Sequence, residues 1–327
     1  MMQPALSTMW MRERHRSLEE FFEAASQLGF ARFELNHWVS HELVEVTHFP
    51  PEVIQGVHAP CPAHPRTRDA EVSALDRDER AAAIEAVTAS LQLAERLGAP
   101  VVILHAGVVS VDPRLDAQLR DLYNQGRRNS HEYADLKVEL VRERARLAER
   151  HLDATRRSLE RLATLADAIG VRIALENRFC YQEIPVPDEL DLLLREFAGP
   201  VGFWFDTGHA YCLEELGFIP HREWLAGFNQ QMLGCHLHDM RTVAQSAEPG
   251  WNGEDRADSP GLRDHDIPGT GVIDFAEVLR YAPPGCLFTC EFETYHPPEQ
   301  VKAGLDYLRQ LSAELCQKEG VTRENAA

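Results

Sequence analysis

The chain alternates short apolar segments with longer segments that repeat with helical spacing. The short segments are rich in β-branched and aromatic residues, which is typical of buried parallel strands. In order they are Ala5–Met9, Ala31–Leu35, Ile54–Val57, Val101–Leu104, Val171–Leu175, Val201–Phe205, Met232–Cys235 and Cys286–Cys290. This pattern predicts eight parallel strands, each followed by a helix or a long loop.

The segments between the predicted strands read as amphipathic helices. Leu18–Leu28 places Phe21, Phe22 and Ala25 on one face, and Gly29 supplies the stop. Further helices are predicted over Arg80–Leu97, Leu152–Ile169 and Glu189–Phe197, closed by Gly98, Gly170 and Gly199. Eight such units in 327 residues predict a (β/α)8 TIM barrel. An open doubly wound sheet is the alternative, but no G-x-G-x-x-G or P-loop follows any predicted strand.

Two segments are longer than a minimal barrel needs. They are Val108–Arg150, after the fourth predicted strand, and Met240–Gly271, after the seventh. Long loops on the C-terminal side of a barrel usually shape or cover the site, and neither segment reads as a separate domain. We therefore predict one barrel domain over residues 1–315 and a flexible C-terminal tail over residues 316–327.

Composition restricts the partners and the compartment. The chain has 33 Lys and Arg against 52 Asp and Glu, a formal net charge of −19, which disfavours nucleic acid. Its seven cysteines are scattered without a C-x-x-C pair, as in an intracellular protein with reduced thiols. No apolar run has the length of a signal peptide or membrane span, so a cytoplasmic protein without membrane contact is expected.

Metal-ligand residue types stand where the predicted strands end. His58, His105, Glu176, Asp206, His236 and Glu291 directly follow strands, and His209 and His265 lie in the loops after the sixth and seventh. In a barrel these positions meet on one rim, where carboxylates without a cation would repel one another. The mixture of carboxylates and imidazoles favours zinc, manganese, cobalt or iron over calcium or magnesium.

Other conspicuous residues have structural interpretations. His238 alternates with His236 along the chain, which favours a supporting or surface role over ligation. Trp10, Trp38 and Trp204 are expected to pack, and His37, His41 and His48 lie in a predicted loop and are expected to be solvated.

The strand-end motifs together resemble the xylose isomerase-like TIM-barrel superfamily. They are Gly56–Pro60, Leu104–Gly107, Leu175–Asn177, Phe205–Ala210, His236–Asp239, His265 with the following Pro268–Phe275, and Glu291. This superfamily includes sugar-phosphate isomerases and epimerases, inosose-processing enzymes and endonuclease IV. The resemblance runs from the first predicted strand to about Glu293.

Resemblance to the isomerases and epimerases implies one divalent ion, commonly manganese or cobalt. Its ligands would be Glu176, Asp206, His236 and Glu291. The same resemblance implies that Glu176 and Glu291 act as acid and base at the carbon next to a metal-polarised carbonyl. His209 would then hold a substrate oxygen.

Resemblance to endonuclease IV implies a larger set around three zinc ions. The corresponding residues are His58, His105, Glu176, Asp206, His209, His236, His265 and Glu291. That family has an aspartate two residues before the histidine matching His265, where this chain has Arg263, with Asp264 adjacent. The sequence therefore leaves the number of ions between one and three, and the role of Asp264 open.

Charge bears on the choice of substrate. One divalent ion among three carboxylates leaves about −1 and favours a neutral polyol, whereas two or three ions suit a phosphate ester. No lysine follows a predicted strand, which argues against the lysine-assisted hydride shift of xylose isomerase itself. Arg178 and Arg241, just past two strand ends, are the residues expected to bind an anionic group of the substrate.

Three hypotheses follow from these residues. The first is a metal-dependent isomerase or epimerase of a sugar, sugar phosphate or cyclic polyol. The second is a multi-zinc hydrolase of a small phosphodiester or related ester. The third is a non-catalytic barrel that binds a sugar or a metal. Each has a small-molecule partner, and a homodimer is one expected state because dimers are common in the superfamily.

Overall fold

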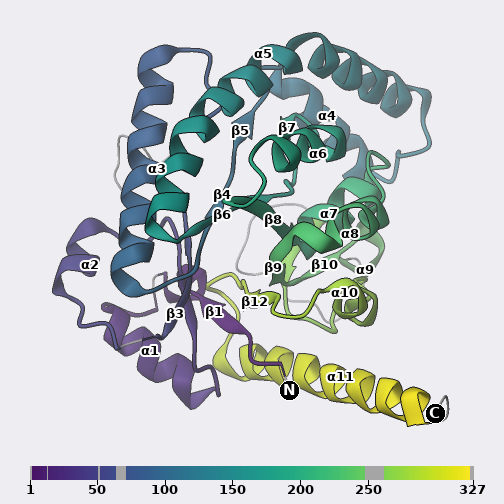
Figure 1. The fold of residues 1–327 in the computed structure, drawn as a ribbon. Helices are drawn as coiled ribbons and strands as arrows, with labels where there is room; N and C mark the ends of the chain where they lie inside the picture. The colour runs from purple at the N-terminus through teal and green to yellow at the C-terminus, as the bar shows by residue number, and fades with distance from the viewer. Residues whose placement is uncertain (1, 13, 51, 64–70, 247–260, 325–327) are drawn as a thin grey trace.

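The strands close into a barrel in the computed structural model, which describes residues 2–12, 14–50, 52–63, 71–246 and 261–324 (Figure 1). Their order is β1-β12-β9-β8-β6-β4-β3-β2, and every neighbouring pair is parallel. The barrel strands are β1 (Ala5–Ser7), β2 (Phe33–Leu35), β3 (Ile54–His58), β4 (Val101–Leu104), β6 (Arg172–Glu176), β8 (Val201–Asp206), β9 (Met232–Leu237) and β12 (Leu287–Cys290). All eight predicted strands are confirmed, and with them the (β/α)8 fold.

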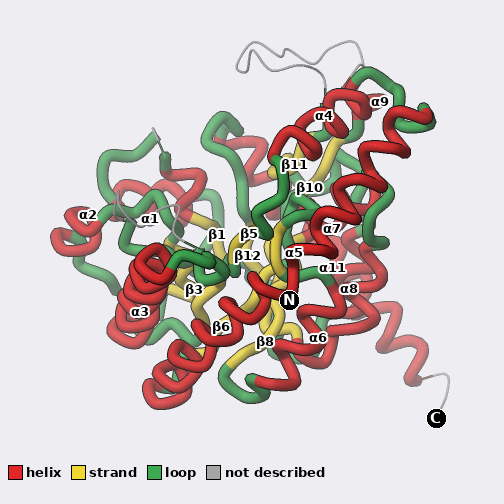
Figure 2. The backbone as a smooth tube through the Cα atoms, turned by 90° about the horizontal axis from the view of Figure 1, so that it is seen from above, coloured by secondary structure: helices red, strands yellow, loops and turns green. Residues whose placement is uncertain are grey.

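Helices surround the barrel, as the view from above shows (Figure 2). They are α1 (Leu18–Gln27), α2 (His41–Val46), α3 (Arg77–Leu97), α4 (Pro113–Asn124), α5 (His131–Ile169), α6 (Pro187–Glu196), α7 (Thr207–Glu215), α8 (His221–Phe228), α9 (Val243–Ser246), α10 (Phe275–Tyr281) and α11 (Pro298–Glu324). Short 3-10 turns cover Thr8–Met11 and Asn229–Gln231. Gly98 and Gly170 end α3 and α5 with φ near 70°, the left-handed cap that the sequence predicts.

The two long connections carry secondary structure of their own. The first contains α4 and the first half of α5, and at its start β5 (Gly107–Val108) pairs with β7 (Glu183–Ile184). The second is framed by the antiparallel pair β10 (Asp239–Arg241) and β11 (Arg263–Asp266), and residues 247–260 lie outside the described part of the chain.

The C-terminal helix continues into the segment predicted as a flexible tail, and its flexibility stays a prediction. Residues 316–324 continue α11 as helix, whose end extends past the barrel (Figure 1), and residues 325–327 lie outside the described residues. Among the described residues, no helix combines the length and apolar character needed to cross a membrane.

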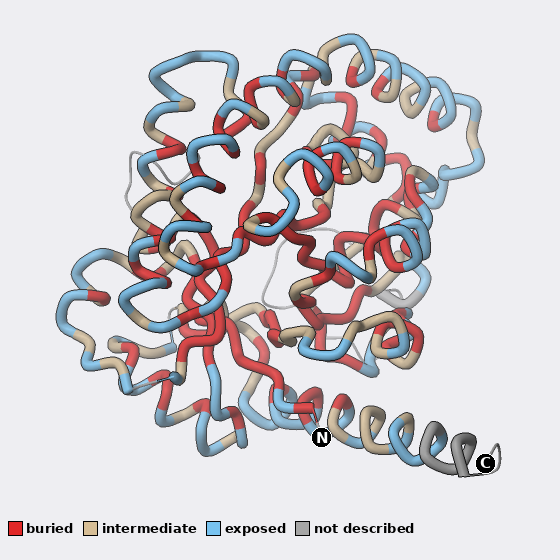
Figure 3. Tube along the Cα trace, viewed as in Figure 1, coloured by how far each residue is buried: buried red, intermediate tan, exposed pale blue. Residues whose placement is uncertain are grey.

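The core has two layers. Buried residues are concentrated in the strands and on the helix faces turned toward them (Figure 3). Inside the barrel, Val101, Ile103, Ala174 and Trp204 form a smaller apolar cluster. Because side chains alternate along a strand, the next inward positions on β4, β6 and β8 are the polar residues at the strand ends. The apolar cluster thus forms the floor beneath the functional site.

Candidate metal centre

Four strands deliver the predicted tetrad to one point. Glu176 ends β6, Asp206 ends β8, His236 lies in β9 and Glu291 follows β12. The first three residues are completely buried, and Glu291 is 7% exposed. Four polar residues in such a place need mutual partners or a cation.

The distances from His236 to the three carboxylates fit those between the ligands of a divalent metal ion. His236 Nδ1 lies 3.2 Å from Glu176 Oε1, 3.5 Å from Asp206 Oδ2 and 3.4 Å from Glu291 Oε2. Ligand bonds of about 2.1 Å place the donor atoms of a tetrahedral zinc site about 3.4 Å apart. The three distances from His236 Nδ1 therefore match the donor spacing of a tetrahedral shell, and Glu176, Asp206 and His236 together form one candidate ligand group.

A second group shares one carboxylate with the tetrad. Glu176 Oε2 lies 3.2 Å from His58 Nε2 and 2.8 Å from His105 Nε2, whereas Glu176 Oε1 faces His236. The ligand atoms of His58, His105 and Glu176 all lie within 4.8 Å of one another. Glu176 could therefore supply one oxygen to an ion held with His58 and His105 and the other oxygen to an ion held with His236.

A third group forms around the residue whose role the sequence left open. Ligand atoms of His209, Asp264 and His265 lie within 4.8 Å of one another, with 3.1 Å between Asp264 Oδ1 and His265 Nδ1. Neighbours in an extended strand point to opposite sides, but His265 adopts φ 57°, which breaks that alternation. Arg263 points elsewhere and donates to the Tyr295 hydroxyl at 2.9 Å.

His238 supports the site and is not a surface residue. It is fully buried, and its Nε2 lies 2.9 Å from Asp206 Oδ2. Its ring stacks on His265 at 4.1 Å, and its Nδ1 accepts the His265 backbone N–H. β9 ends at Leu237, so the alternation that suggested an opposite face no longer applies at His238. The supporting alternative is thus the one that the contacts favour, although His238, His265 and Glu291 also form a ligand-like group.

Glu34 is a buried member of the site that the sequence analysis did not include. It lies in the middle of β2, is completely buried, and places Oε1 3.1 Å from His236 Nε2. It was not predicted because the candidate residues were sought directly after the strands, and Glu34 lies within one. The available signal was a carboxylate between two apolar residues of a strand, at an inward position.

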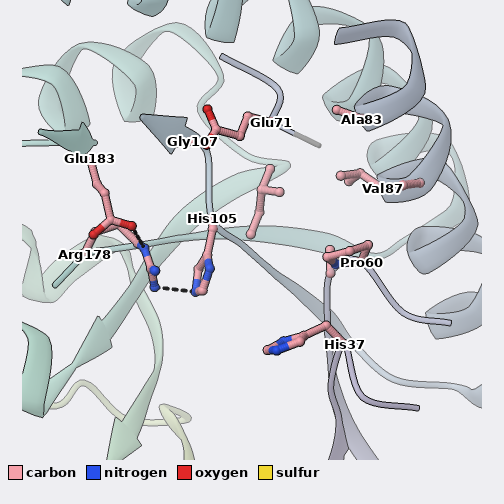
Figure 4. A pocket seen from close by; sticks show the side chains of 12 residues that line it. His37, Pro60, Glu71, Ala83, Val87, His105, Gly107, Arg178 and Glu183 are labelled. Carbon is pink, nitrogen blue, oxygen red and sulfur yellow. Dashed lines mark hydrogen bonds and ion pairs between the residues drawn. The ribbon is translucent and has the colours of Figure 1, made fainter. Parts of the chain in front are cut away.

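A cavity of about 400 Å³ opens beside His105 (Figure 4). Apolar side chains including Pro60 and Val87 form one wall. Arg178 lies on the other wall, where its Nη1 donates to His105 Nε2 at 2.5 Å and its Nε donates to Glu183 at 2.9 Å. Arg178 is thus close to the candidate ligands His105 and Glu176, where a substrate-binding residue was expected.

The remaining predicted residues are distributed differently. Arg241 lies 3.1 Å from Asp266, and no contact within the described ranges links it to the ligand cluster. His37 lines the cavity, in contrast to the solvated role expected for it, whereas His41 and His48 are exposed. Trp10 and Trp204 are buried in packing roles, and Trp38 stacks under the Arg12 guanidinium at 4.1 Å.

The comparisons with known proteins agree with this architecture. The family model described as xylose isomerase-like TIM barrel matches residues 22–311. The chain belongs to this family. The resemblance seen in the strand-end motifs is therefore confirmed over most of the chain. No curated protein sequence matches significantly.

Solved structures similar to this family member share its fold at low identity. A D-tagatose 3-epimerase-like protein is 18% identical, with a TM-score of 0.61 over 97% of this chain and 99% of that one. A Thermus thermophilus protein, TTHB071, soaked with ZnCl2, is 21% identical, with a TM-score of 0.56 over 96% and 99%. The IolI protein with a zinc atom is 14% identical, with a TM-score of 0.60 over 97% and 99%. These likenesses concern the fold.

Within the site, facing charges keep the carboxylates ionised. Burial acts to raise the pKa of Glu176, yet the imidazoles of His105 and His236 outweigh it and hold that pKa well below its ordinary value. The pKa of Asp206 is lowered in the same way, with burial again opposed by neighbouring histidines. The site therefore presents anionic oxygens to any cation that enters.

The histidines divide into two kinds. Burial acts to lower the pKa of His236, but surrounding carboxylates, Glu291 foremost, raise it well above the ordinary value. Asp264 has the same effect on the pKa of His265. In contrast, burial and the Arg178 guanidinium hold the pKa of His105 well below the ordinary range, which favours a neutral ring whose Nε2 accepts from Arg178.

Proposed function

We propose that this chain is a divalent-metal-dependent isomerase or epimerase of a sugar, sugar phosphate or cyclic polyol. The observation that carries the proposal is the convergence of three carboxylate oxygens on His236 Nδ1 at 3.2–3.5 Å. The residues that would hold the ion are Glu176, Asp206, His236 and Glu291. Zinc, manganese and cobalt all suit this donor set. The D-tagatose 3-epimerase-like neighbour is consistent with such chemistry.

The proposed reaction moves a proton at the carbon next to a carbonyl. A bound divalent ion would polarise that carbonyl and so acidify the neighbouring C–H bond. Glu176 and Glu291 come from strands on different sides of the barrel, and the pKa of each is held below its ordinary value. Ionised carboxylates on two sides of a substrate can remove the proton from one face and return it to the other.

Exposure separates the two glutamates. Glu176 is completely buried and contacts His58, His105 and His236, whereas Glu291 retains 7% exposure. Glu291 is therefore the carboxylate that a substrate entering the site meets first. His209, close to Glu176 and Asp264, would bind a substrate oxygen, and Arg178 would bind a polar or anionic group in the adjoining cavity.

The test follows exchange of the substrate C–H bond with solvent. Metal-loaded protein is incubated in D2O with a panel of ketoses, ketose phosphates and inososes, and deuterium incorporation is measured by NMR. Glu291→Gln and Glu176→Gln are expected to lower the rate by about 100-fold or more, as general acid–base groups do. Glu277→Gln is the matched control, because Glu277 contacts His221 outside the site. Full turnover in both site variants would overturn the proton-transfer assignment.

A second candidate is a multi-zinc hydrolase of a small phosphoester. It is favoured by the bridging position of Glu176 and by the group of His209, Asp264 and His265. Glu34 and Asp264 add to the three carboxylates predicted from sequence. Five negative charges and one divalent ion leave about −3, so the cluster has room for further ions before it becomes positive enough for a phosphate ester.

Metal stoichiometry distinguishes the two candidates. Elemental analysis is made on protein purified without chelator or metal-affinity resin, beside His58→Ala. One ion per chain, unchanged by the substitution, supports the isomerase. Two or three zinc ions, with one lost in His58→Ala, support the hydrolase and direct the substrate panel to phosphoesters.

A further inference from the structure

Glu34 makes a contact that no part of the proposed reaction uses. Both of its carboxylate oxygens lie near His236 Nε2, at 3.1 and 3.3 Å. The other ring nitrogen of His236 faces the carboxylates of the tetrad. Both ring nitrogens of His236 therefore face carboxylates, Nδ1 those of the tetrad and Nε2 that of Glu34.

The fold provides a dedicated place for this carboxylate. Phe33 and Leu35 are buried on either side of Glu34 in β2, and Glu34 points into the barrel between strands that present the small residues Ser7 and Gly56 in register with it. Within the described part of the chain, His236 is the hydrogen-bond partner of Glu34. A fully buried carboxylate without a strong partner is costly, so this contact is what makes Glu34 tolerable there.

We propose that Glu34 is a positioning residue that fixes His236 in the tautomer with its proton on Nε2. A neutral imidazole carries one proton, and a nitrogen can bind a metal only if it is the unprotonated one. By accepting a hydrogen bond from Nε2–H, Glu34 leaves the Nδ1 lone pair free to bind an ion held by Glu176, Asp206 and Glu291. This inference rests on the proposed metal-dependent function.

The arrangement has a chemical consequence beyond orientation. A carboxylate on the outer nitrogen of a ligating histidine makes that histidine a stronger donor, and its removal typically lowers metal affinity about 10–100-fold. Glu34 faces Nε2 of the ring, whereas the tetrad oxygens face Nδ1, and the ligand atoms of Glu34, His236 and Glu291 lie within 4.8 Å of one another. It acts through His236 and has no contact with the reacting atoms in this proposal.

The experiment measures metal affinity, not turnover. Metal-free wild type, Glu34→Gln, Glu34→Asp and Glu277→Gln are titrated with Zn²⁺ or Co²⁺ in competition with a chromophoric chelator. Glu34→Gln keeps the shape but loses the charge, and is expected to weaken binding by about 10–100-fold. Glu34→Asp keeps the charge and is expected to restore part of the affinity. Glu277→Gln, which alters another Glu–His contact, is expected to bind like wild type.

A second readout follows the proton itself. In zinc-loaded protein labelled with ¹⁵N-histidine, one Nε2–H resonance should be exchange-protected and should shift in Glu34→Gln but not in Glu277→Gln. Deuterium exchange of substrate at saturating metal should change far less than metal affinity does, which separates positioning from catalysis.

The outcomes are distinct for the two proposals. Equal affinity of wild type and Glu34→Gln, with the metal bound by both, overturns the role of Glu34 and leaves the metal-dependent function standing. Loss of one whole ion from Glu34→Gln, with unchanged affinity for the rest, overturns it as well and makes Glu34 a ligand. Absence of metal binding in wild type sinks both proposals.

Discussion

Gly208, in the first turn of α7, faces the imidazole of His238. A Cβ at this position would lie 2.3 Å from His238 Cε1 and 2.6 Å from Nδ1. His238 is fully buried, bonded to Asp206 and stacked on His265, so it has little room to withdraw. Because Gly208 has no side chain, His238 has room to contact both Asp206 and His265.

We expect Gly208→Ala to displace His238 and to lower the free energy of unfolding by about 1–3 kcal/mol, the usual effect of overpacking. Metal content should fall as well, because the displaced ring no longer supports Asp206. Gly227→Ala is the control: Gly227 is exposed in α8 with no atom near its Cβ position, and the substitution should be neutral or stabilising by up to about 1 kcal/mol. Urea unfolding measures both, and equal stability of the two variants would contradict the crowding argument.

At the scale of elements, the β10–β11 pair organises the loop that carries Asp264 and His265. Asp239 in β10 accepts backbone N–H groups from Gly269, Thr270, Gly271 and Ile273, besides that of Met240. Five donors on one buried carboxylate fix the Pro-Gly-Thr-Gly turn against the end of β9. The motif His236–Asp239 thus supplies both a candidate ligand and the anchor of the loop that carries the next two candidate ligands.

The same elements show what a sequence can and cannot predict. The eight strands follow from short apolar runs, several of them preceded by a helix that ends at a glycine, and these are local signals. The strand-end residues converge because parallel strands share one rim. The β10–β11 pairing joins residues across an intervening long loop, and no local pattern specifies it. Asp264 enters the site through that pairing and through the positive φ of His265, so its role could not be predicted.

The alternation of side chains along a strand explains why Glu34 was not predicted as part of the site. Glu34 shares the inward side of the barrel with the candidate ligands at the strand ends, yet its partner His236 lies 202 residues further along the chain. A buried carboxylate in an apolar strand signals a partner without identifying it. His238 was harder still, because its position depends on where β9 stops and the chain bends.

At the scale of the whole molecule, a barrel in a chain of net charge −19 gathers several carboxylates at one end. Without a metal ion, protons on the histidines and the Arg178 guanidinium are the available counter-charges. The pKa of His236 and His265 is raised well above the ordinary value, and that of Glu176 and Asp206 is lowered well below it. The metal-free fold is therefore linked to pH through both kinds of group.

The sign of each linkage follows from the direction of its shift. A raised histidine pKa contributes stability that is fully present below about pH 6.5, the unfolded value, and is lost as the pH rises through the folded-state pKa. A lowered carboxylate pKa contributes stability that is present above about pH 4.5 and lost as the pH falls through the folded-state pKa. The two windows overlap in mildly acidic solution.

We expect chelator-treated protein to have its highest melting temperature in that overlap and to lose stability as the pH is raised toward about 9. Protein loaded with a divalent ion should melt at a higher temperature and lose less over the same range, because the ion replaces the histidine protons as counter-charge and binds better once they have left. Thermal unfolding between about pH 5 and 9, with and without metal, measures both curves. A metal-free protein whose melting temperature rises steadily over this range would show that the histidines are not the counter-charge, and would remove the electrostatic reason for a cation at the centre of the barrel.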